Sequence, residues 1–172
     1  MEQEALVELI PRLRRYARAL TGERFRADDL VQDTLERALS KWALWRPGTD
    51  LRAWTFTIMH NVFVNQVKRS VLAAESLDPD AGMDVEDSGA RADTLAQLNA
   101  LNSALQRLPD EHREVLLLIT LEGFSYDEAA HTLGLPIGTV MSRLARARGK
   151  LAVLLEGNGA AAQSQVQLKL VK

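Results

Sequence analysis

The sequence predicts an all-α protein with two small helical domains joined by a flexible acidic linker, the second ending in a helix-turn-helix. Apolar residues recur at helical spacing on both sides of an aspartate-rich stretch, and no strand pattern of the βαβ kind occurs. The segment 124–151 has the turn chemistry of a helix-turn-helix. With 47% hydrophobic residues, the 172-residue chain can build helical cores of this kind.

The N-terminal domain is expected to span residues 1–74 and to contain three helices. Gly22 closes the first helix, because glycine tolerates the backbone geometry at a helix C-terminus. Pro47 and Gly48 break the chain before the third helix, which Thr49 or Asp50 can cap. The predicted helices cover 4–20, 27–42 and 51–74.

The linker is expected to span residues 75–92. Its sequence from position 76, SLDPDAGMDVEDSGARA, lacks helical periodicity and combines proline and glycine with many aspartates. Residues 71–93 carry 1 basic and 7 acidic side chains, so this stretch has a net charge of −6. A long surface loop within a single domain is the alternative, but loops of this length are uncommon there. The net charge of −2 for the whole chain hides two mildly basic flanking pieces.

The C-terminal domain is expected to span residues 93–156, with helices near 93–108 and 110–121 before the helix-turn-helix. Ser125 and Glu128 form the S-x-x-E pattern of a capping box. Gly134 and Pro136 then suit the end of one helix and the start of the next. The last helix has an apolar stripe formed by Val140, Leu144, Ala147 and Leu151. The low-complexity tail, 157–172, is expected to be disordered.

The last helix is also basic on its other side. Between positions 137 and 151 it carries four basic residues and no acidic one. Such a surface neutralises DNA phosphates, and arginine can read guanine edges. A solvated basic helix of an ordinary helical protein is the alternative interpretation. The side chains predicted to contact DNA are Thr139, Ser142, Arg143, Arg146 and Lys150.

Several functional classes find no support in the sequence. The chain has no cysteine, and its histidines, His60, His112 and His131, lack the spacing of metal ligands. No catalytic motif or glycine-rich phosphate loop occurs, so we expect neither an enzyme nor a cofactor or metal site. The acidic N-terminus and the absence of a long apolar segment argue against membrane insertion. We therefore expect a cytoplasmic location.

Three motifs in order resemble the bacterial RNA polymerase sigma factors of the extracytoplasmic-function (ECF) group. They are DDLVQDTLERAL (28–39), RPGTDLRAWTFTIMHNVFVNQVKR (46–69) and LQRLPDEHREVLLLITLEGFSYDEAAHTLGLPIGTVMSRLARARGKL (105–151). The resemblance covers about residues 5–72 and 94–156. It implies sigma domain 2 at 1–74 and sigma domain 4 at 93–156. The stretch around PGTDLRAW also resembles the general stress-response branch of the group.

The resemblance assigns a role to each motif. The first would bind the clamp of core RNA polymerase, the second would open and read the −10 promoter element, and the third would read the −35 element. Helical spacing independently groups most of the first set on one acidic and polar face. The expected polymerase contacts are Asp28, Asp29, Gln32, Asp33 and Glu36. The expected −10 contacts are Arg46, Thr49, Asp50, Arg52, Asn61, Asn65, Lys68 and Arg69.

Two positions depart from the pattern of the family. Many members carry a basic residue where this chain has Met141, and a basic residue is common where it has His60. Readout of the −35 element would then depend on Ser142, Arg143 and Arg146. Trp54 is interpreted as a core residue. For Trp42 and Trp45, both stacking on melted bases and a structural role remain open.

The resemblance implies a promoter-specific initiation subunit in a stress or envelope response. Its expected partners are core RNA polymerase, promoter DNA and an anti-sigma protein. Two other functional classes remain open. A sigma-like decoy would sequester an anti-sigma protein, but such adaptors usually carry a receiver domain, and the sequence has no βα pattern for one. A stand-alone helix-turn-helix regulator would leave the first two motifs without a role.

Overall fold

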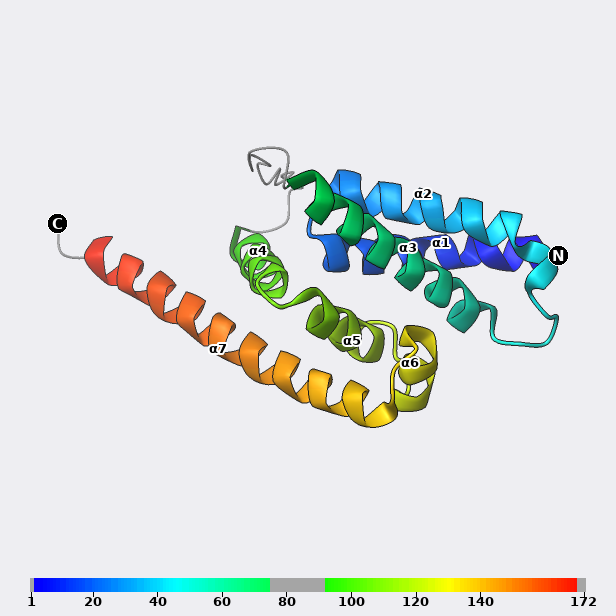
Figure 1. Cartoon of the computed structure of the whole chain (residues 1–172). Helices are drawn as coiled ribbons and strands as arrows, with labels where there is room; N and C mark the ends of the chain where they lie inside the picture. Colours follow the sequence, from blue (N-terminus) through cyan, green and yellow to red (C-terminus); the bar gives the residue numbers. More distant parts are fainter. Residues whose placement is uncertain (1, 75–91, 170–172) are drawn as a thin grey trace.

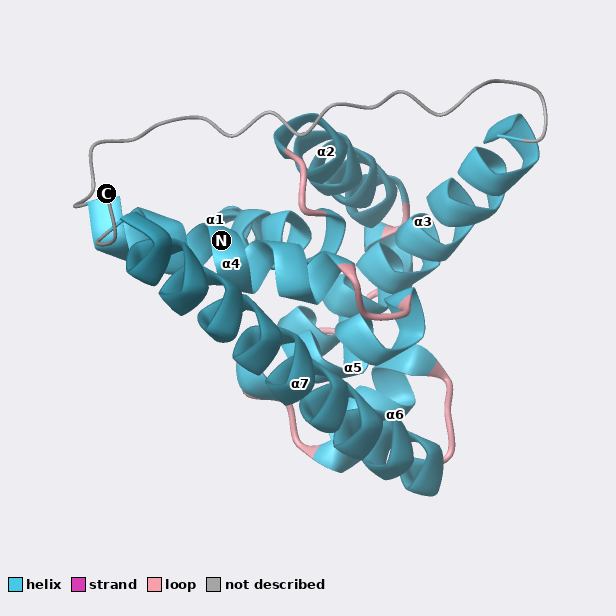
Figure 2. Ribbon diagram, turned by 90° about the vertical axis from the view of Figure 1, so that its left-hand side faces the viewer, coloured by secondary structure: helices cyan, strands magenta, loops and turns pink. Residues whose placement is uncertain are grey.

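A computed structural model describes the backbone of residues 2–74 and 92–169, with side chains placed in 4–74 and 93–157 (Figure 1). Within these ranges the chain contains only helices, turns and loops (Figure 2), which confirms the predicted all-α fold class. The predicted linker lies almost wholly outside the described residues. The elements are α1 (Glu2–Thr21), α2 (Arg24–Ser40), the 3-10 turn η1 (Trp42–Leu44), α3 (Leu51–Ala74), α4 (Ala92–Gln106), α5 (Asp110–Thr120), α6 (Tyr126–Leu133) and α7 (Ile137–Lys169).

Helices α1, α2 and α3 form the N-terminal bundle. The ring of Tyr16 on α1 packs edge-on against Phe56 of α3, with centroids 5.1 Å apart. Leu13, Leu30 and Met59 are fully buried between the three helices. Burying such side chains contributes about 1.5–3 kcal/mol each, so the apolar faces predicted from periodicity hold this bundle together.

Helices α4 to α7 form the C-terminal bundle. Val140, Leu144 and Ala147 of α7 are buried, as their spacing predicts. The amide of Glu128 donates to Ser125 Oγ at 3.1 Å, and the amide of Ser125 donates to Glu128 Oε2 at 2.8 Å. This geometry confirms the capping box at the start of α6. Gly134 ends α6 with φ of 63°, a left-handed conformation that favours glycine.

Helix ends differ from the predicted bounds by one or two residues at several places, and by more at two. Helix α2 begins at Arg24, three residues before the predicted start, because Glu23 already takes the extended backbone of an N-cap. Helix α7 continues through 157–169, where the sequence predicts a disordered tail. Two glycines in a helix cost only about 1 kcal/mol each relative to alanine, and the following alanines and glutamines favour helix.

The two bundles pack against each other. Helix α1 contacts α4 and α5, and α3 contacts α6, for example through Arg52 and Glu128. Figure 1 shows α5 and α6 lying along one side of the N-terminal bundle, with α7 on the far side of α5. No helix within the described ranges is both long and apolar enough to cross a membrane.

Candidate polymerase and promoter interfaces

The predicted polymerase contacts divide between two sides of α2. Asp28, Gln32 and Glu36 line a groove of about 390 Å³ beside α1. Within it, Gln32 Nε2 donates to Glu36 Oε1 at 3.2 Å. Leu39, which is 53% exposed, adds an apolar wall. The groove therefore offers carboxylates beside apolar surface, a combination that suits a basic partner helix.

The other two predicted contacts lie outside this groove. Asp33 is half-buried, and its Oδ2 accepts a hydrogen bond from Gln66 Nε2 of α3 at 2.9 Å. Asp29 is exposed but does not line the groove. Asp33 thus has a structural role in joining α2 to α3, which its helical spacing alone could not reveal.

The loop before α3 is held by its own polar side chains. Thr49 Oγ1 donates to the carbonyl oxygen of Arg46 at 2.7 Å. Asp50 Oδ1 accepts from the amides of Arg52 at 2.9 Å and Ala53 at 3.2 Å, so Asp50 caps α3. Of the two capping candidates in the sequence, the structure selects Asp50.

This loop borders a cleft of about 410 Å³ that also receives His131 from α6. Arg46, Thr49 and Asp50, all predicted −10 contacts, lie at its edge. Its apolar lining includes Trp45 and Trp54. The cleft therefore combines hydrogen-bonding groups with indole surface, which can accommodate an extruded base.

The three tryptophans form one cluster. The ring centroids of Trp42 and Trp45 are 5.3 Å apart, and those of Trp42 and Trp54 are 6.1 Å apart. Trp42 and Trp54 pack on the hydrophobic core, which confirms the core role expected for Trp54. The buried Nε1 of Trp45 has no hydrogen-bond partner among the described residues. A structural role for Trp42 and Trp45 is thus present, while stacking on bases remains a prediction.

Helix α3 presents a separate polar stripe along its outer side. Asn61, Asn65, Lys68 and Arg69 are all exposed and recur at helical spacing. This stripe brings together half of the predicted −10 contacts. The side chain of Arg52 does not join it, because Arg52 turns toward the C-terminal bundle.

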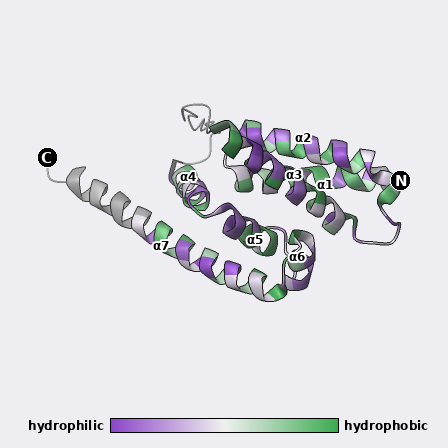
Figure 3. Cartoon of the chain, viewed as in Figure 1, coloured by the Kyte–Doolittle hydropathy of each residue, from purple (hydrophilic) through white to green (hydrophobic). Residues whose placement is uncertain are grey.

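The predicted −35 contacts lie along one side of α7, but they differ in exposure, and one of them is held in an ion pair. Ser142, Arg146 and Lys150 are exposed, and Thr139 is half-buried. Figure 3 shows hydrophilic turns alternating with hydrophobic ones along the described part of α7. Ser142 Oγ donates to the carbonyl oxygen of Thr139 at 3.1 Å.

Arg143 is bound to another helix of the same bundle. Its Nη2 lies 3.0 Å from Glu111 Oε2, at the start of α5, and its side chain is only 23% exposed. Burial lowers the pKa of the neighbouring His112 imidazole, and the charges of Arg146 and Arg143 lower it further. The cations of α7 therefore gather where α5 begins, and Glu111 engages Arg143 in this structure.

The structure also reveals charged residues that the sequence did not single out. Three of them are buried where the two bundles meet: Arg113, Glu114 and Glu122. Arg12 and Arg15 of α1 approach Glu122 from the other bundle. The flanking sequence offers no local signal for these contacts, because the partners lie more than 100 residues apart.

Known proteins match both bundles. Residues 6–60 match the family described as the Sigma2 domain of PhyR, and residues 98–151 match Sigma-70, region 4. The chain is 37% identical over 158 residues to the ECF RNA polymerase sigma factor EcfG of Rhodopseudomonas palustris, covering 92% of this chain and 87% of that protein. It is 34% identical over 146 residues to the ECF RNA polymerase sigma factor SigM of Mycobacterium tuberculosis, covering 83% and 71%.

Solved structures agree with this relationship. The sigma factor RpoE, in complex with the anti-sigma factor NepR from Bartonella quintana, superposes with a TM-score of 0.76 at 35% identity. That match covers 90% of this chain and 96% of the other. CnrH, in complex with the cytosolic domain of CnrY, gives a TM-score of 0.63 at 30% identity and covers 90% of both chains.

The chain belongs to the ECF RNA polymerase sigma factors. Proteins of this family bind core RNA polymerase and direct it to promoters, and they are not enzymes. The resemblance identified from the three sequence motifs is thereby confirmed.

Proposed function

We propose how this sigma factor divides its work between the two bundles. The N-terminal bundle acts as domain 2, binding core polymerase at the groove between α1 and α2 and contacting the −10 element with the loop before α3 and the outer stripe of α3. The C-terminal bundle acts as domain 4 and reads the −35 element with α7. The observation that carries this proposal is the helix-turn-helix of α6 and α7, whose second helix exposes Ser142, Arg146 and Lys150.

We also propose a stress-response role and an anti-sigma partner. The RpoE of Bartonella quintana, which matches 90% of this chain, is bound to the anti-sigma factor NepR, and this complex supports a partner of the NepR kind. The protein would act in the cytoplasm, because RNA polymerase and promoter DNA, its proposed partners, are there.

Run-off transcription with bacterial core polymerase on a library of promoter sequences tests the proposal. We expect transcripts only when the chain is added, and only from templates that share −35 and −10 elements. Absence of any transcript, combined with tight binding to a NepR-type protein, would favour the decoy function instead.

Reversing charge in the groove of α2 should weaken polymerase binding. We expect Asp28→Lys combined with Glu36→Lys to lower affinity for core polymerase by roughly 30-fold or more, because repulsion replaces attraction at an interface and costs several kcal/mol. Titration of labelled protein with core enzyme measures the affinity, and circular dichroism checks that the helices remain.

The matched control is Asp29→Lys, which changes the charge of the same helix outside the groove. If Asp29→Lys weakened binding more than the double variant, the polymerase would contact the other side of α2.

A further inference from the structure

We propose that the contact between the two bundles is autoinhibitory. Carboxylates of the C-terminal bundle bind cations of the N-terminal bundle and withhold Arg52 from promoter DNA until the bundles separate. The inference rests on the proposed −10 role of Arg52, but the contact itself can be measured independently of that role. We call this set of contacts the interbundle contact; it comprises Arg12, Arg15, Arg52 and His60 on one side and Glu114, Glu122, Phe124 and Glu128 on the other.

Glu122 forms the centre of the interbundle contact. Its carboxylate side chain is fully buried, and it lies in the connection between α5 and α6. Arg12 Nε lies 2.9 Å from Oε2, and Arg15 Nη2 lies 3.2 Å from Oε1. Every ion pair described for this carboxylate therefore comes from the other bundle. A buried carboxylate is stable only when it is paired, so the two arginines hold the bundles together.

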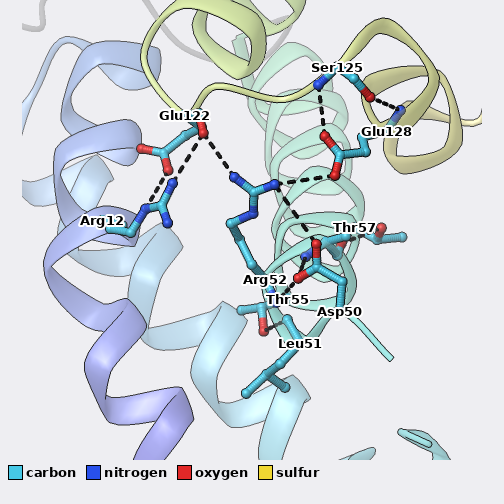
Figure 4. Close-up of polar contacts among 10 residues, drawn as sticks. Arg12, Asp50, Leu51, Arg52, Thr55, Thr57, Glu122, Ser125 and Glu128 are labelled. Carbon is cyan, nitrogen blue, oxygen red and sulfur yellow. Dashed lines mark hydrogen bonds and ion pairs between the residues drawn. The ribbon is translucent and has the colours of Figure 1, made fainter. Parts of the chain in front are cut away.

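The closest contacts of the Arg52 guanidinium are with the C-terminal bundle, and a longer one, from Nη2 to Asp50 Oδ2 at 3.8 Å, stays within its own bundle (Figure 4). Its Nη1 donates to the carbonyl oxygen of Glu122 at 3.0 Å, and its Nη2 lies 3.4 Å from Glu128 Oε1. The guanidinium carbon also sits 4.3 Å from the centroid of the Phe124 ring. These partners resemble what DNA offers an arginine, namely anionic oxygens and an aromatic face. An Arg52 engaged in this way is unavailable to the promoter.

His60 makes a second link on α3. Its Nδ1 lies 2.6 Å from Glu114 Oε1, and the Glu114 side chain is only 7% exposed. Burial raises the pKa of the Glu114 carboxyl, while the hydrogen bond and charge of His60 lower it. His60 directly precedes Asn61, a predicted −10 contact that is itself exposed, so this pair ties α3 to the C-terminal bundle next to the start of the polar stripe.

The chemistry of the interbundle contact favours reversible opening. Its ion pairs lie at the edge of an apolar core that both bundles share, and the side chains of Arg12 and Arg15 remain 38% and 56% exposed. Aromatic packing across it includes Phe124 against Phe56, with centroids 5.4 Å apart. Polar contacts between parts of one chain typically permit relative motion, and salt screens partly exposed pairs. On opening, water rehydrates both the carboxylates and the guanidinium groups, so no buried charge is left without a partner.

Opening can be measured by energy transfer in the full chain. The sequence has no cysteine, so Ser40→Cys and Ala152→Cys introduce unique labelling sites at exposed positions on opposite bundles. We expect high transfer in the otherwise wild-type chain and a large drop in Glu122→Arg. Because a substitution at a buried site could disturb folding, Arg12→Glu with Arg15→Glu provides an independent route from the partly exposed side. Glu156→Arg, with the same charge change at an exposed site on α7, should leave the transfer unchanged.

A second experiment tests the effect on function. It measures how tightly each variant binds fluorescent single-stranded DNA of random sequence in the absence of polymerase. If the closed form holds about nine-tenths of the free chains, Glu122→Arg should bind about tenfold more tightly. Adding Arg52→Ala to that variant should remove the gain, which Glu156→Arg should not show.

Two results would overturn the inference. Equal energy transfer in the wild-type chain and both opening variants would mean that these ion pairs do not hold the bundles. Opening without an Arg52-dependent gain in DNA binding would make the contact structural rather than autoinhibitory. A failure of the proposed function would appear separately, as absence of run-off transcripts from a chain whose energy transfer still responds to Glu122→Arg.

Discussion

Arg113→Ala is expected to be the most destabilising single substitution in this chain, lowering the free energy of unfolding by about 3–5 kcal/mol. The Arg113 residue is only 5% exposed. Its guanidinium donates to the carbonyl oxygens of Leu105 and Leu108, each at 2.8 Å, and to that of Gln106 at 3.2 Å. These carbonyls end α4 and form the turn into α5, where few backbone amides are available; only that of Leu105 also accepts one, from the amide of Leu108 at 3.1 Å.

The same guanidinium also joins the two bundles. Arg113 Nη1 donates to the carbonyl oxygen of Leu20, near the end of α1, at 2.8 Å, and to Asp110 Oδ1 at 3.0 Å. Alanine would remove the donor that the structure gives to the carbonyls of Leu20, Gln106 and Leu108, and would leave a cavity. Thermal unfolding followed by circular dichroism should show a midpoint lower by roughly 10 °C for a chain of this size.

Two further variants make this expectation specific. Arg113→Lys keeps the charge but replaces the planar fork by a single ammonium group, so an intermediate loss is expected. Arg107→Ala removes an exposed arginine from the same connection and should change stability by less than about 0.5 kcal/mol. Equal stability of Arg113→Ala and Arg107→Ala would contradict the role assigned to the buried guanidinium.

Arg146→Ala should cause the largest loss of −35 recognition. An arginine that pairs with a base edge contributes about 1–3 kcal/mol, which corresponds to a loss of roughly 5-fold to 150-fold in affinity. Arg146 is exposed on α7, whereas Arg143 is engaged by Glu111 in the free chain. Binding of the variants to duplex DNA that carries the −35 element, measured at fixed salt, checks the order of effects.

Met141 and Glu111 provide the comparisons. Met141 is 46% exposed on α7, but its thioether offers only weak contacts, so Met141→Ala should lose less affinity than Arg146→Ala. Glu111→Gln releases Arg143 from its ion pair and should strengthen binding if Arg143 reads the same element. A larger loss for Met141→Ala than for Arg146→Ala would shift the reading face toward Met141.

Local sequence patterns predicted the helices because helix caps and apolar periodicity depend on residues only a few positions apart. The Ser125–Glu128 capping box and the left-handed Gly134 depend on neighbours three to five positions away, and both confirm the prediction. The apolar stripe of α7 could also be predicted from the sequence, because residues on one helical face recur every three or four positions. The same periodicity, together with three motifs in order, was sufficient to identify the sigma-factor family.

The tertiary structure decided which way the polar side chains turn. Sequence position placed Arg52 and Arg143 among the DNA contacts, but packing brought Glu128 to the first and Glu111 to the second. Asp33 likewise lies on the predicted acidic face of α2 and is drawn toward Gln66 by the packing of α3. Domain boundaries and the remaining site assignments stay predictions that the proposed experiments test.

The amino-acid sequence by itself determined the all-helical class, the helix-turn-helix and the family, because each depends on short-range spacing. Only the tertiary structure decided that Glu122 is buried between Arg12 and Arg15, and that His60 meets Glu114. The partners in these pairs are 107 and 110 residues apart for Glu122 and 54 residues apart for His60. No local pattern encodes contacts at such separation; they form because the packing of the two bundles buries the carboxylates of Glu122 and Glu114, which then need partners from the other bundle.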